Sequence, residues 1–491
     1  MRKIDKKTQN AILSCLATMG SGLVEGSEAN AFVRRFYPVR QHLLALDPDV
    51  VLVLGERGTG KTTLFKAVFA NKLLPDLGAF GLNLRLPYRE TDRIKLIPGH
   101  PIGPGFPDAR GLKQVLTSPQ RAMELWFAYL VRILKEEIDH SSSLQFLDLP
   151  GGAPDQVLGA FDASGNEPLL ALDRLDQALQ QADQWLFVGY DELDTLGGFD
   201  WDAMAEAIKG LVAFWSTYAR RWQRLRAKIF LRTDLFRRHA GLGGADLAKL
   251  AANRVELSWS DLDIFSMLIK RIANTDDRLY DYCKRSRVPF NKEPHPTFNH
   301  IPNLKTAEDA RPFIERIVGK YMGANRTKGQ SFTWVLDHLR DSHKCATPRS
   351  LVRLIEQAAQ KERNNPRAVS PALIHPTSLR QALEDVSVDH VKQAENEWPW
   401  LAGVKDRVKA NKLVPWNRRD LEKLLAQDWD KPWGQRKGNQ PVAPPVQNAR
   451  ELIDYLVELG VFRVRPSDRI DVPDIYLFGL GLRRKGGVKR K

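Results

Sequence analysis

The sequence predicts an α/β protein, in which a parallel sheet lies between two layers of helices, followed by mainly helical domains. Up to about residue 260, short apolar strand patterns at 50–54, 185–190 and 228–231 alternate with helical patterns. Such alternation is typical of parallel sheets that helices cover on both faces. Beyond residue 260 the patterns are helical almost to the end of the chain. At 491 residues, the chain is too long for a single hydrophobic core, so several domains are expected.

The first strand pattern is followed by a Gly-rich turn with the spacing G-x-x-x-x-G-K-T and then by a helical pattern. Glycines allow the backbone to turn its N–H groups toward an anion, and the helix N-terminus adds partial positive charge. Lys61 is expected to reach the β- and γ-phosphates of a nucleotide, and Thr62 to offer its hydroxyl to Mg²⁺. ATP and Mg²⁺ are therefore the expected cofactors. The residues expected to hold the nucleotide are Gly55, Glu56, Arg57, Gly58, Thr59, Gly60, Lys61, Thr62 and Thr63.

The second strand pattern, 185–190, ends in two adjacent carboxylates, Asp191 and Glu192. At the tip of a strand, Asp191 is placed to hold Mg²⁺ and Glu192 to polarise the attacking water. The alternative is a surface acidic pair after a core strand. Paired carboxylates favour an ATPase over a small-molecule kinase, because the sequence shows no second substrate site.

The third strand pattern, 228–231, is followed by Arg232, Thr233 and Asp234. A polar residue here is expected to lie between the other two strand tips and to orient the water; Thr233 is the first candidate, with Arg232 and Asp234 as alternatives. Thr233 and Asp234 could equally cap the next helix. Three arginines follow that could reach the nucleotide of a neighbouring subunit in a homo-oligomer: Arg237, Arg238 and Arg254.

Two further features depend on helical patterns. In Thr347-Pro348-Arg349, Pro348 suits the first turn of a helix, and Arg349 would project from that turn toward the γ-phosphate. The alternative is an ordinary helix start with an exposed arginine. The basic run 220–228, which includes Trp222, is expected to form a solvated helix face rather than a nucleic-acid site.

Over residues 30–365 the order of these elements resembles the AAA+ ATPases and their STAND and origin-recognition relatives. The sequence Asp191-Glu192-Leu193-Asp194 looks most like the origin-recognition branch. In this resemblance, 55–62 corresponds to Walker A, 191–194 to Walker B, 232–234 to sensor 1 and 347–349 to sensor 2. It implies an ATPase core, a helical lid and often a C-terminal winged helix.

The expected domains are a helical N-terminal segment (1–48), a P-loop ATPase core (49–260), a helical lid (261–365) and a C-terminal helical and winged-helix-like domain with a basic tail (366–491). The hairpin pattern at 461–472 would supply the wing, and the tail 483–491 would add phosphate contacts. The helix pattern before the wing carries Glu451, Asp454 and Glu458, which suits a major-groove reader poorly, so protein is an alternative partner of this domain.

The net charge of +15 favours a polyanionic partner, and residues 401–491 hold 20 Lys and Arg against 11 Asp and Glu. Three widely spaced cysteines and the absence of a long apolar run predict a cytoplasmic protein without a membrane segment. The function expected first is an ATP-driven switch that acts on or with DNA. The alternative is a STAND-like signalling ATPase of a bacterial antiviral defence system that controls a separate effector protein. A nucleotide-binding protein with a purely structural role is the third reading.

Overall fold

The computed structural model describes residues 6–19, 29–80, 93–100, 111–112, 115–116, 118–138, 144, 147, 149, 154–196, 201–239, 253–369, 372–435 and 441–485. The chain divides into two compact units, Pro38–Ser258 and a second one formed by Met1–Tyr37 together with Trp259–Lys491. The core expected at 49–260 lies almost wholly within the first unit. The finer division of the second unit at residue 365 stays a prediction.

The first unit is built around a five-stranded parallel sheet with the order β2-β3-β4-β1-β5. The predicted α/β class and parallel sheet are therefore confirmed. The strands are β1 (Leu52–Gly55), β2 (Ile94–His100), β3 (Trp185–Tyr190), β4 (Leu225–Arg232) and β5 (Val255–Glu256). The helices are α3 (Arg40–Leu44), α4 (Lys61–Phe65), a π-helical turn (Lys66–Ala70), a 3-10 segment (Leu74–Phe80), α6 (Pro119–Ile133), α7 (Pro154–Ala163), α8 (Glu167–Gln181), α9 (Trp201–Tyr218) and α10 (Thr233–His239).

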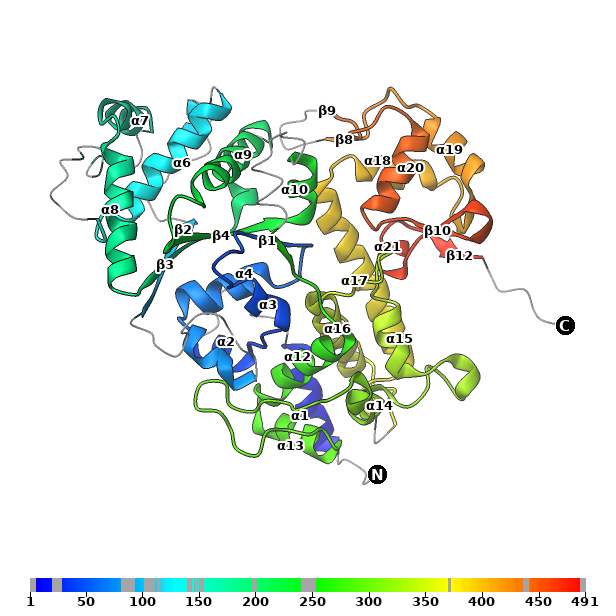
Figure 1. Cartoon of the computed structure of the whole chain (residues 1–491). Coiled ribbons are helices and arrows are strands. Elements are labelled where there is room, and N and C mark those ends of the chain that lie inside the picture. The colour runs from blue at the N-terminus through cyan, green and yellow to red at the C-terminus, as the bar shows by residue number, and fades with distance from the viewer. Residues whose placement is uncertain are drawn as a thin grey trace. The chain divides into compact units, whose positions relative to one another are not determined.

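Alternating side chains of the buried strands point to the two faces of this sheet, which gives the unit three layers. One face packs against α6, α8 and α9 through residues such as Leu186, Val188 and Ile229. On the other face, Phe230 of β4 contacts Phe65 and Phe69 edge to face, with ring centroids 5.8 and 6.4 Å apart. The helix that follows β1 is thereby fixed against the sheet (Figure 1).

Two segments differ from the sequence prediction. The Pro- and Gly-rich stretch 76–118 shows no strand pattern in the sequence, yet Ile94–His100 forms the edge strand β2 beside β3. An edge strand tolerates Pro98 because its missing N–H need not be part of the ladder, and the register shifts between Pro98 and His100.

The second difference is that the basic run 220–228 is not a helix face. Helix α9 ends at Tyr218, and β4 begins at Leu225. The carboxylate of Asp176 accepts hydrogen bonds from the backbone N–H groups of 223, 224 and 225, at 3.0, 2.7 and 2.8 Å. These bonds satisfy the N–H groups outside a helix, and so direct the chain into the strand.

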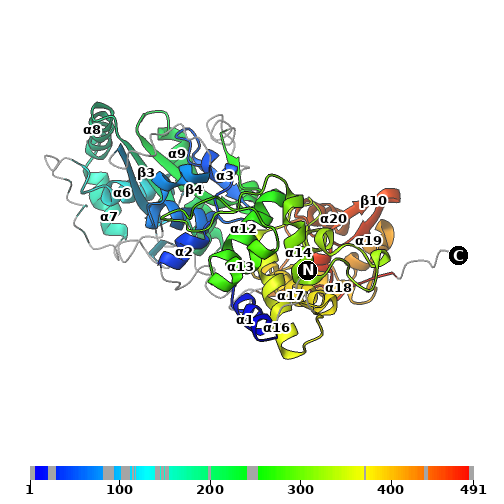
Figure 2. The same ribbon diagram turned by 90° about the horizontal axis from the view of Figure 1, so that it is seen from below.

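The second unit is mainly helical, and its N-terminal helix α1 (Lys6–Ala17) packs along α16 (Pro348–Asn364), as Figure 2 shows. Buried cations hold this segment: Arg271 donates to the carbonyl oxygen of Met19, and Lys270 to that of Arg34 at 2.7 Å. The other helices up to residue 400 are α2 (Ala29–Arg35), α12 (Asp261–Ala273), α13 (Asp277–Arg285), a 3-10 turn (Ala307–Ala310), α14 (Arg311–Val318), a 3-10 turn (Arg326–Lys328), α15 (Ser331–Asp337) and α17 (Pro376–Glu397).

The C-terminal part of this unit combines short helices with a three-stranded antiparallel sheet of order β10-β11-β7. The winged-helix-like character of this part stays a prediction. Its elements are α18 (Leu401–Val408), β6 (Leu413–Val414), β7 (Trp416–Asn417), α19 (Arg418–Ala426), β8 (Gly434–Gln435), β9 (Pro441–Val442), α20 (Ala449–Glu458), β10 (Arg463–Arg465), a turn (Pro466–Asp468), β11 (Arg469–Asp471), α21 (Asp474–Leu477) and β12 (Arg483–Arg484). Of the expected basic tail, 486–491 lies outside the described residues. Among the helices that the structure describes, none combines the length and the apolar character needed to span a bilayer.

Candidate functional site

The loop between β1 and α4 has the backbone shape of an anion-binding loop. Gly58 and Gly60 have φ values of 83° and 96°, which L side chains rarely adopt. A Cβ at Gly55 would lie 2.5 Å from Oγ1 of Thr59. The Thr59 hydroxyl donates to the carbonyl oxygen of Glu56 at 2.7 Å, which closes the turn. The positions of these glycines are therefore required by the loop itself.

Lys61, the first residue of α4, folds its side chain back across the loop. Its ammonium group donates to the carbonyl oxygens of Gly55 at 2.6 Å and Glu56 at 3.0 Å. Burial and, second, the positive charge of Arg232 lower the pKa of Lys61 to about 8. An ammonium group that donates to loop carbonyl oxygens is suited to donate to phosphate oxygens instead.

Asp191 follows β3 and is only 3% exposed. One oxygen of its carboxylate accepts a hydrogen bond from the Thr62 side chain, while the other, Oδ2, is buried without a hydrogen-bond partner. Burial raises the pKa of Asp191 to about 6. A hydroxyl next to a carboxylate with an unused oxygen fits the oxygen ligands that Mg²⁺ prefers.

This pair does not complete a metal site by itself. Within the described ranges, His, Cys, Asp and Glu side chains form no group of three that could hold a metal ion. Mg²⁺ usually keeps several waters and binds through one or two protein groups plus substrate phosphates. Thr62 and Asp191 therefore fit a metal ion that arrives with the nucleotide.

His100, at the end of the edge strand β2, supports Asp191 from the side. Its Nδ1 lies 2.7 Å from the carbonyl oxygen of Asp191, and the N–H of Asp191 donates to the carbonyl oxygen of His100 at 2.9 Å. Burial lowers the pKa of His100. The sequence around His100 gives no strand signal, because the residue lies between two prolines in a Pro-Gly-rich stretch, so His100 is not among the predicted site residues.

Glu192 has a left-handed backbone conformation, with φ 55° and ψ 28°, which is uncommon for a residue other than glycine. Its carbonyl oxygen accepts a hydrogen bond from the Thr195 hydroxyl at 2.7 Å. The chain thus turns sharply directly after Asp191. Such conformations persist only where the surroundings hold them, and they occur often at functional sites.

Gly189 and Tyr190 make the end of β3 less apolar than a buried strand usually is, and packing explains both. A Cβ at Gly189 would lie 2.6–2.8 Å from atoms of the Phe69 ring. The fully buried Tyr190 ring lies edge to face on Trp126, with centroids 5.6 Å apart. Gly189 therefore lets the helix after the phosphate loop approach the strand that carries Asp191.

The strand order places β4 between β1 and β3, so the residues after β4 lie between the other two strand tips, as the sequence analysis expected. Arg232 is 8% exposed and donates to both carboxylate oxygens of Asp234, at 3.1 and 2.7 Å. It also lies 3.8 Å from the carboxylate of Asp194. The Thr233 hydroxyl is buried and donates instead to Glu256 of β5 at 3.4 Å. The water-orienting role of Thr233 stays a prediction of the sequence.

The phosphate loop after β1, the carboxylates after β3 and the inserted strand β4 together decide the fold. The first unit has a P-loop α/β fold.

A comparison with known proteins finds two solved structures that are similar to this chain. No protein-family model matches the chain, and no curated protein sequence matches it significantly. The Orc2 protein of Aeropyrum pernix, in complexes with ADPNP and ADP, is similar at 12% identity and a TM-score of 0.30, over 93% of this chain and 99% of that one. Cdc6p of Pyrobaculum aerophilum is similar at 12% identity and a TM-score of 0.30, over 92% and 97%.

The remaining candidate arginines lie on α16, on α10 and just before β5. Helix α16 begins at Pro348, as expected, and the Thr347 side chain caps it by accepting the N–H of Ser350 at 3.2 Å. Arg349 lies in this first turn, half-buried, in the second unit. Arg254 is exposed just before β5. Arg237 and Arg238 belong to α10, and their side chains lie outside the described residues.

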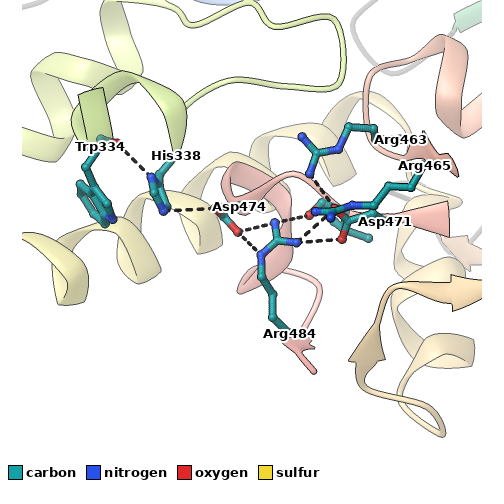
Figure 3. Close-up of polar contacts among 8 residues, drawn as sticks. Trp334, His338, Arg463, Arg465, Asp471, Asp474 and Arg484 are labelled. Carbon is teal, nitrogen blue, oxygen red and sulfur yellow. Dashed lines mark hydrogen bonds and ion pairs between the residues drawn. The ribbon is translucent and has the colours of Figure 1, made fainter. Parts of the chain in front are cut away.

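The predicted hairpin at 461–472 is present as β10 and β11 with the turn Pro466–Asp468. Two of its arginines, together with Arg484 of β12, gather around one carboxylate: Asp471 is fully buried, and Arg463, Arg465 and Arg484 bind it at 2.6, 2.5 and 2.8 Å (Figure 3). Arg484 also binds Asp474, which lies 3.6 Å from His338. The positive charges of the wing are thus largely engaged within the domain.

Proposed function

We propose that the protein binds ATP together with Mg²⁺ at the loop 55–63 and hydrolyses it. The observation that carries this proposal is the cluster of Lys61, Thr62 and Asp191, in which one buried carboxylate oxygen of Asp191, Oδ2, has no hydrogen-bond partner and the Lys61 ammonium group donates to two loop carbonyl oxygens. Unsatisfied buried polar groups are rare in proteins and call for an explanation. A metal ion that binds with the triphosphate would satisfy Oδ2, and the phosphates would give the ammonium group an anionic acceptor.

Each residue of the cluster has a separate role in this proposal. The Lys61 ammonium would exchange the two loop carbonyls for phosphate oxygens. Thr62 and Asp191 would hold the metal, which when bound neutralises negative charge that develops on the phosphates. Glu192, next to Asp191 and held by the sharp turn, would accept a proton from the attacking water.

The residues at the end of β4 would stabilise the negative charge of the phosphates, rather than orient the attacking water through a hydroxyl. Arg232 contributes to the lowered pKa of Lys61, whereas the Thr233 hydroxyl contacts Glu256. We therefore assign the polar role between the strand tips to Arg232 before Thr233. The assignments of Arg349 as a nucleotide sensor and of Arg237, Arg238 or Arg254 as a finger remain predictions of the sequence.

Two variants with one control test the site. Lys61→Ala should lower ATP affinity about 10- to 100-fold, because charge-assisted hydrogen bonds are lost. Glu192→Gln should keep ATP affinity and slow phosphate release about 100-fold or more, the usual contribution of a general base. Asp194→Asn removes a neighbouring, more exposed carboxylate of the same turn and should change turnover little. If Glu192→Gln and Asp194→Asn had the same turnover, Glu192 would not be the base.

We further propose that the ATPase acts on or with DNA as a nucleotide-controlled switch and that it forms homo-oligomers. The net charge of +15 supports a polyanionic partner. Binding to duplex DNA at moderate salt, and ATP turnover with and without DNA, test the association. If DNA neither bound nor altered turnover, the proposal would be abandoned. The STAND-like signalling alternative stays a prediction of the sequence.

A further inference from the structure

The loop between α14 and α15 is an exposed but well-ordered hairpin, residues 320–330, which we call the basic hairpin. Tyr321 and Gln330 form an antiparallel bridge at its base. The N–H of Met322 donates to the carbonyl oxygen of Gly329 at 2.9 Å, and Arg380 donates to the carbonyl oxygen of Met322. Met322 itself is fully buried, so the hairpin is anchored to the helical unit.

The tip of the basic hairpin is held by its own side chains. Asn325 accepts hydrogen bonds from the N–H and the hydroxyl of Thr327, at 3.2 and 2.6 Å. The backbone N–H groups of Lys328 and Gly329 each donate three residues back, at 3.1 Å. All residues from 323 to 329 are nevertheless exposed. The tip is therefore a fixed surface whose side chains are open to a partner.

The charge of this surface is of one sign. Lys320, Arg326 and Lys328 lie in a stretch, 316–336, without any Asp or Glu. In the part of the chain that the structure describes, no carboxylate lies within ion-pair distance of these three cations. The ammonium nitrogen of Lys320 lies over the Tyr321 ring, 5.5 Å from the ring centroid. By contrast, the arginines of the wing share Asp471 (Figure 3).

This contrast distinguishes the two basic surfaces. A phosphate that binds a wing arginine must compete with a carboxylate already in place, whereas a phosphate at the basic hairpin displaces only water and counterions. A preorganised cationic loop also loses little conformational entropy on binding. We propose that the basic hairpin, through Arg326 and Lys328, contacts the phosphate backbone of duplex DNA without reading its sequence. This inference rests on the proposed association with DNA.

The test measures duplex DNA affinity of the full-length protein over a series of salt concentrations. Each phosphate contact contributes about −0.9 to the slope of log Kobs against log salt concentration. The double variant Arg326→Gln with Lys328→Gln should therefore reduce the magnitude of the slope by about 2. It should also weaken binding equally for DNA duplexes of unrelated sequence. The conservative change Arg326→Lys should retain the slope. Because both side chains are exposed and unpaired, the thermal unfolding of the variants should match that of the wild type.

The matched control is Arg278→Gln with Lys409→Gln, which removes the same two charge types where each is paired with an aspartate. A similar loss of slope in the control and in the hairpin variant would show a general charge effect and overturn the inference. If the wild type bound duplex DNA and the hairpin variant bound it with the same slope, the hairpin would be excluded while the DNA association stood. If the wild type did not bind DNA at low salt, both would fail.

Discussion

The Thr62 side chain forms a hydrogen bond to one oxygen of Asp191, while the other oxygen of the same carboxylate is buried without a partner. Burial raises the pKa of Asp191 to about 6. Because a metal ligand must be ionised, we expect the Mg²⁺-dependent part of ATP affinity to fall about tenfold per pH unit below 6. Titrations between pH 5 and 8, with and without Mg²⁺, measure it. An equal pH dependence in Asp191→Asn would contradict this origin.

The same raised pKa predicts a cost in stability when no nucleotide is bound. The folded state holds the Asp191 proton more tightly than the unfolded state does. Protonated Asp191 therefore stabilises the folded protein below pH 4, and this contribution is lost as the pH rises through 6. Asp191→Asn should therefore stabilise the nucleotide-free protein by about 1–3 kcal/mol at pH 7.5, since a one-unit shift corresponds to 1.36 kcal/mol. Urea unfolding at pH 7.5 and at pH 4.5 checks this, and the gain should shrink at the lower pH.

Lys61 is expected to take up a proton when ATP binds. Its pKa of about 8 leaves it partly neutral at pH 8, and phosphate oxygens favour its charged form. Calorimetry at pH 8 in buffers of different ionisation enthalpy should show uptake of up to about half a proton per ATP. Lys61→Arg carries a charge that does not titrate, so its binding heat should not depend on the buffer. The same uptake in the arginine variant would assign the proton to another group.

Gly189→Ala tests the close packing behind Asp191. Its Cβ would lie 2.6–2.8 Å from the Phe69 ring, so we expect destabilisation by about 1–3 kcal/mol together with weaker ATP binding. Gly159→Ala, in an exposed position of α7 with nothing within 4 Å, should instead be neutral or stabilising by up to about 1 kcal/mol. Adding Phe69→Leu to Gly189→Ala should recover part of the loss in thermal unfolding; strictly additive effects would indicate that the two sites do not interact.

Asp471 should determine the stability of the wing. Although burial alone raises its pKa, the arginines around it, Arg463 first, lower it below the ordinary value. Its stabilisation is therefore present above pH 4 and is lost as the pH falls through the lowered pKa. Asp471→Asn should cost about 2–3 kcal/mol at pH 7, less than the 3–5 typical of fully buried pairs, because the arginines are partly exposed.

The matched comparison for the wing is the ion pair Arg418–Asp468, in which the carboxylate of Asp468 is exposed. Asp468→Asn leaves Arg418 bound to Asp454, so it should cost less than about 1 kcal/mol. Unfolding of both variants, followed by tryptophan fluorescence, separates the two cases. Equal losses would mean that burial of Asp471 adds nothing to its ion pairs.

Much of the candidate site could be predicted from the sequence because its parts are local. The spacing from Gly55 to Thr62 requires only a strand, a turn and a helix in succession, and the structure shows that order. Asp191 and Glu192 could be found in the same way, as acids directly after an apolar strand. The helix start at Pro348 also follows from a local signal, the cap residue Thr347.

Other features follow from contacts between distant segments, which local patterns do not specify. His100 was hidden in a Pro-Gly-rich stretch because only the pairing with β3 makes Ile94–His100 a strand. The basic run at 220–228 leaves the helix because Asp176, far away in the sequence, binds its backbone. The sequence by itself determined which residues are the candidates for binding a triphosphate, since that prediction depends on short spacings. Only the tertiary structure decided which arginines are already paired with carboxylates, because ion pairing depends on strand and helix packing across the whole unit.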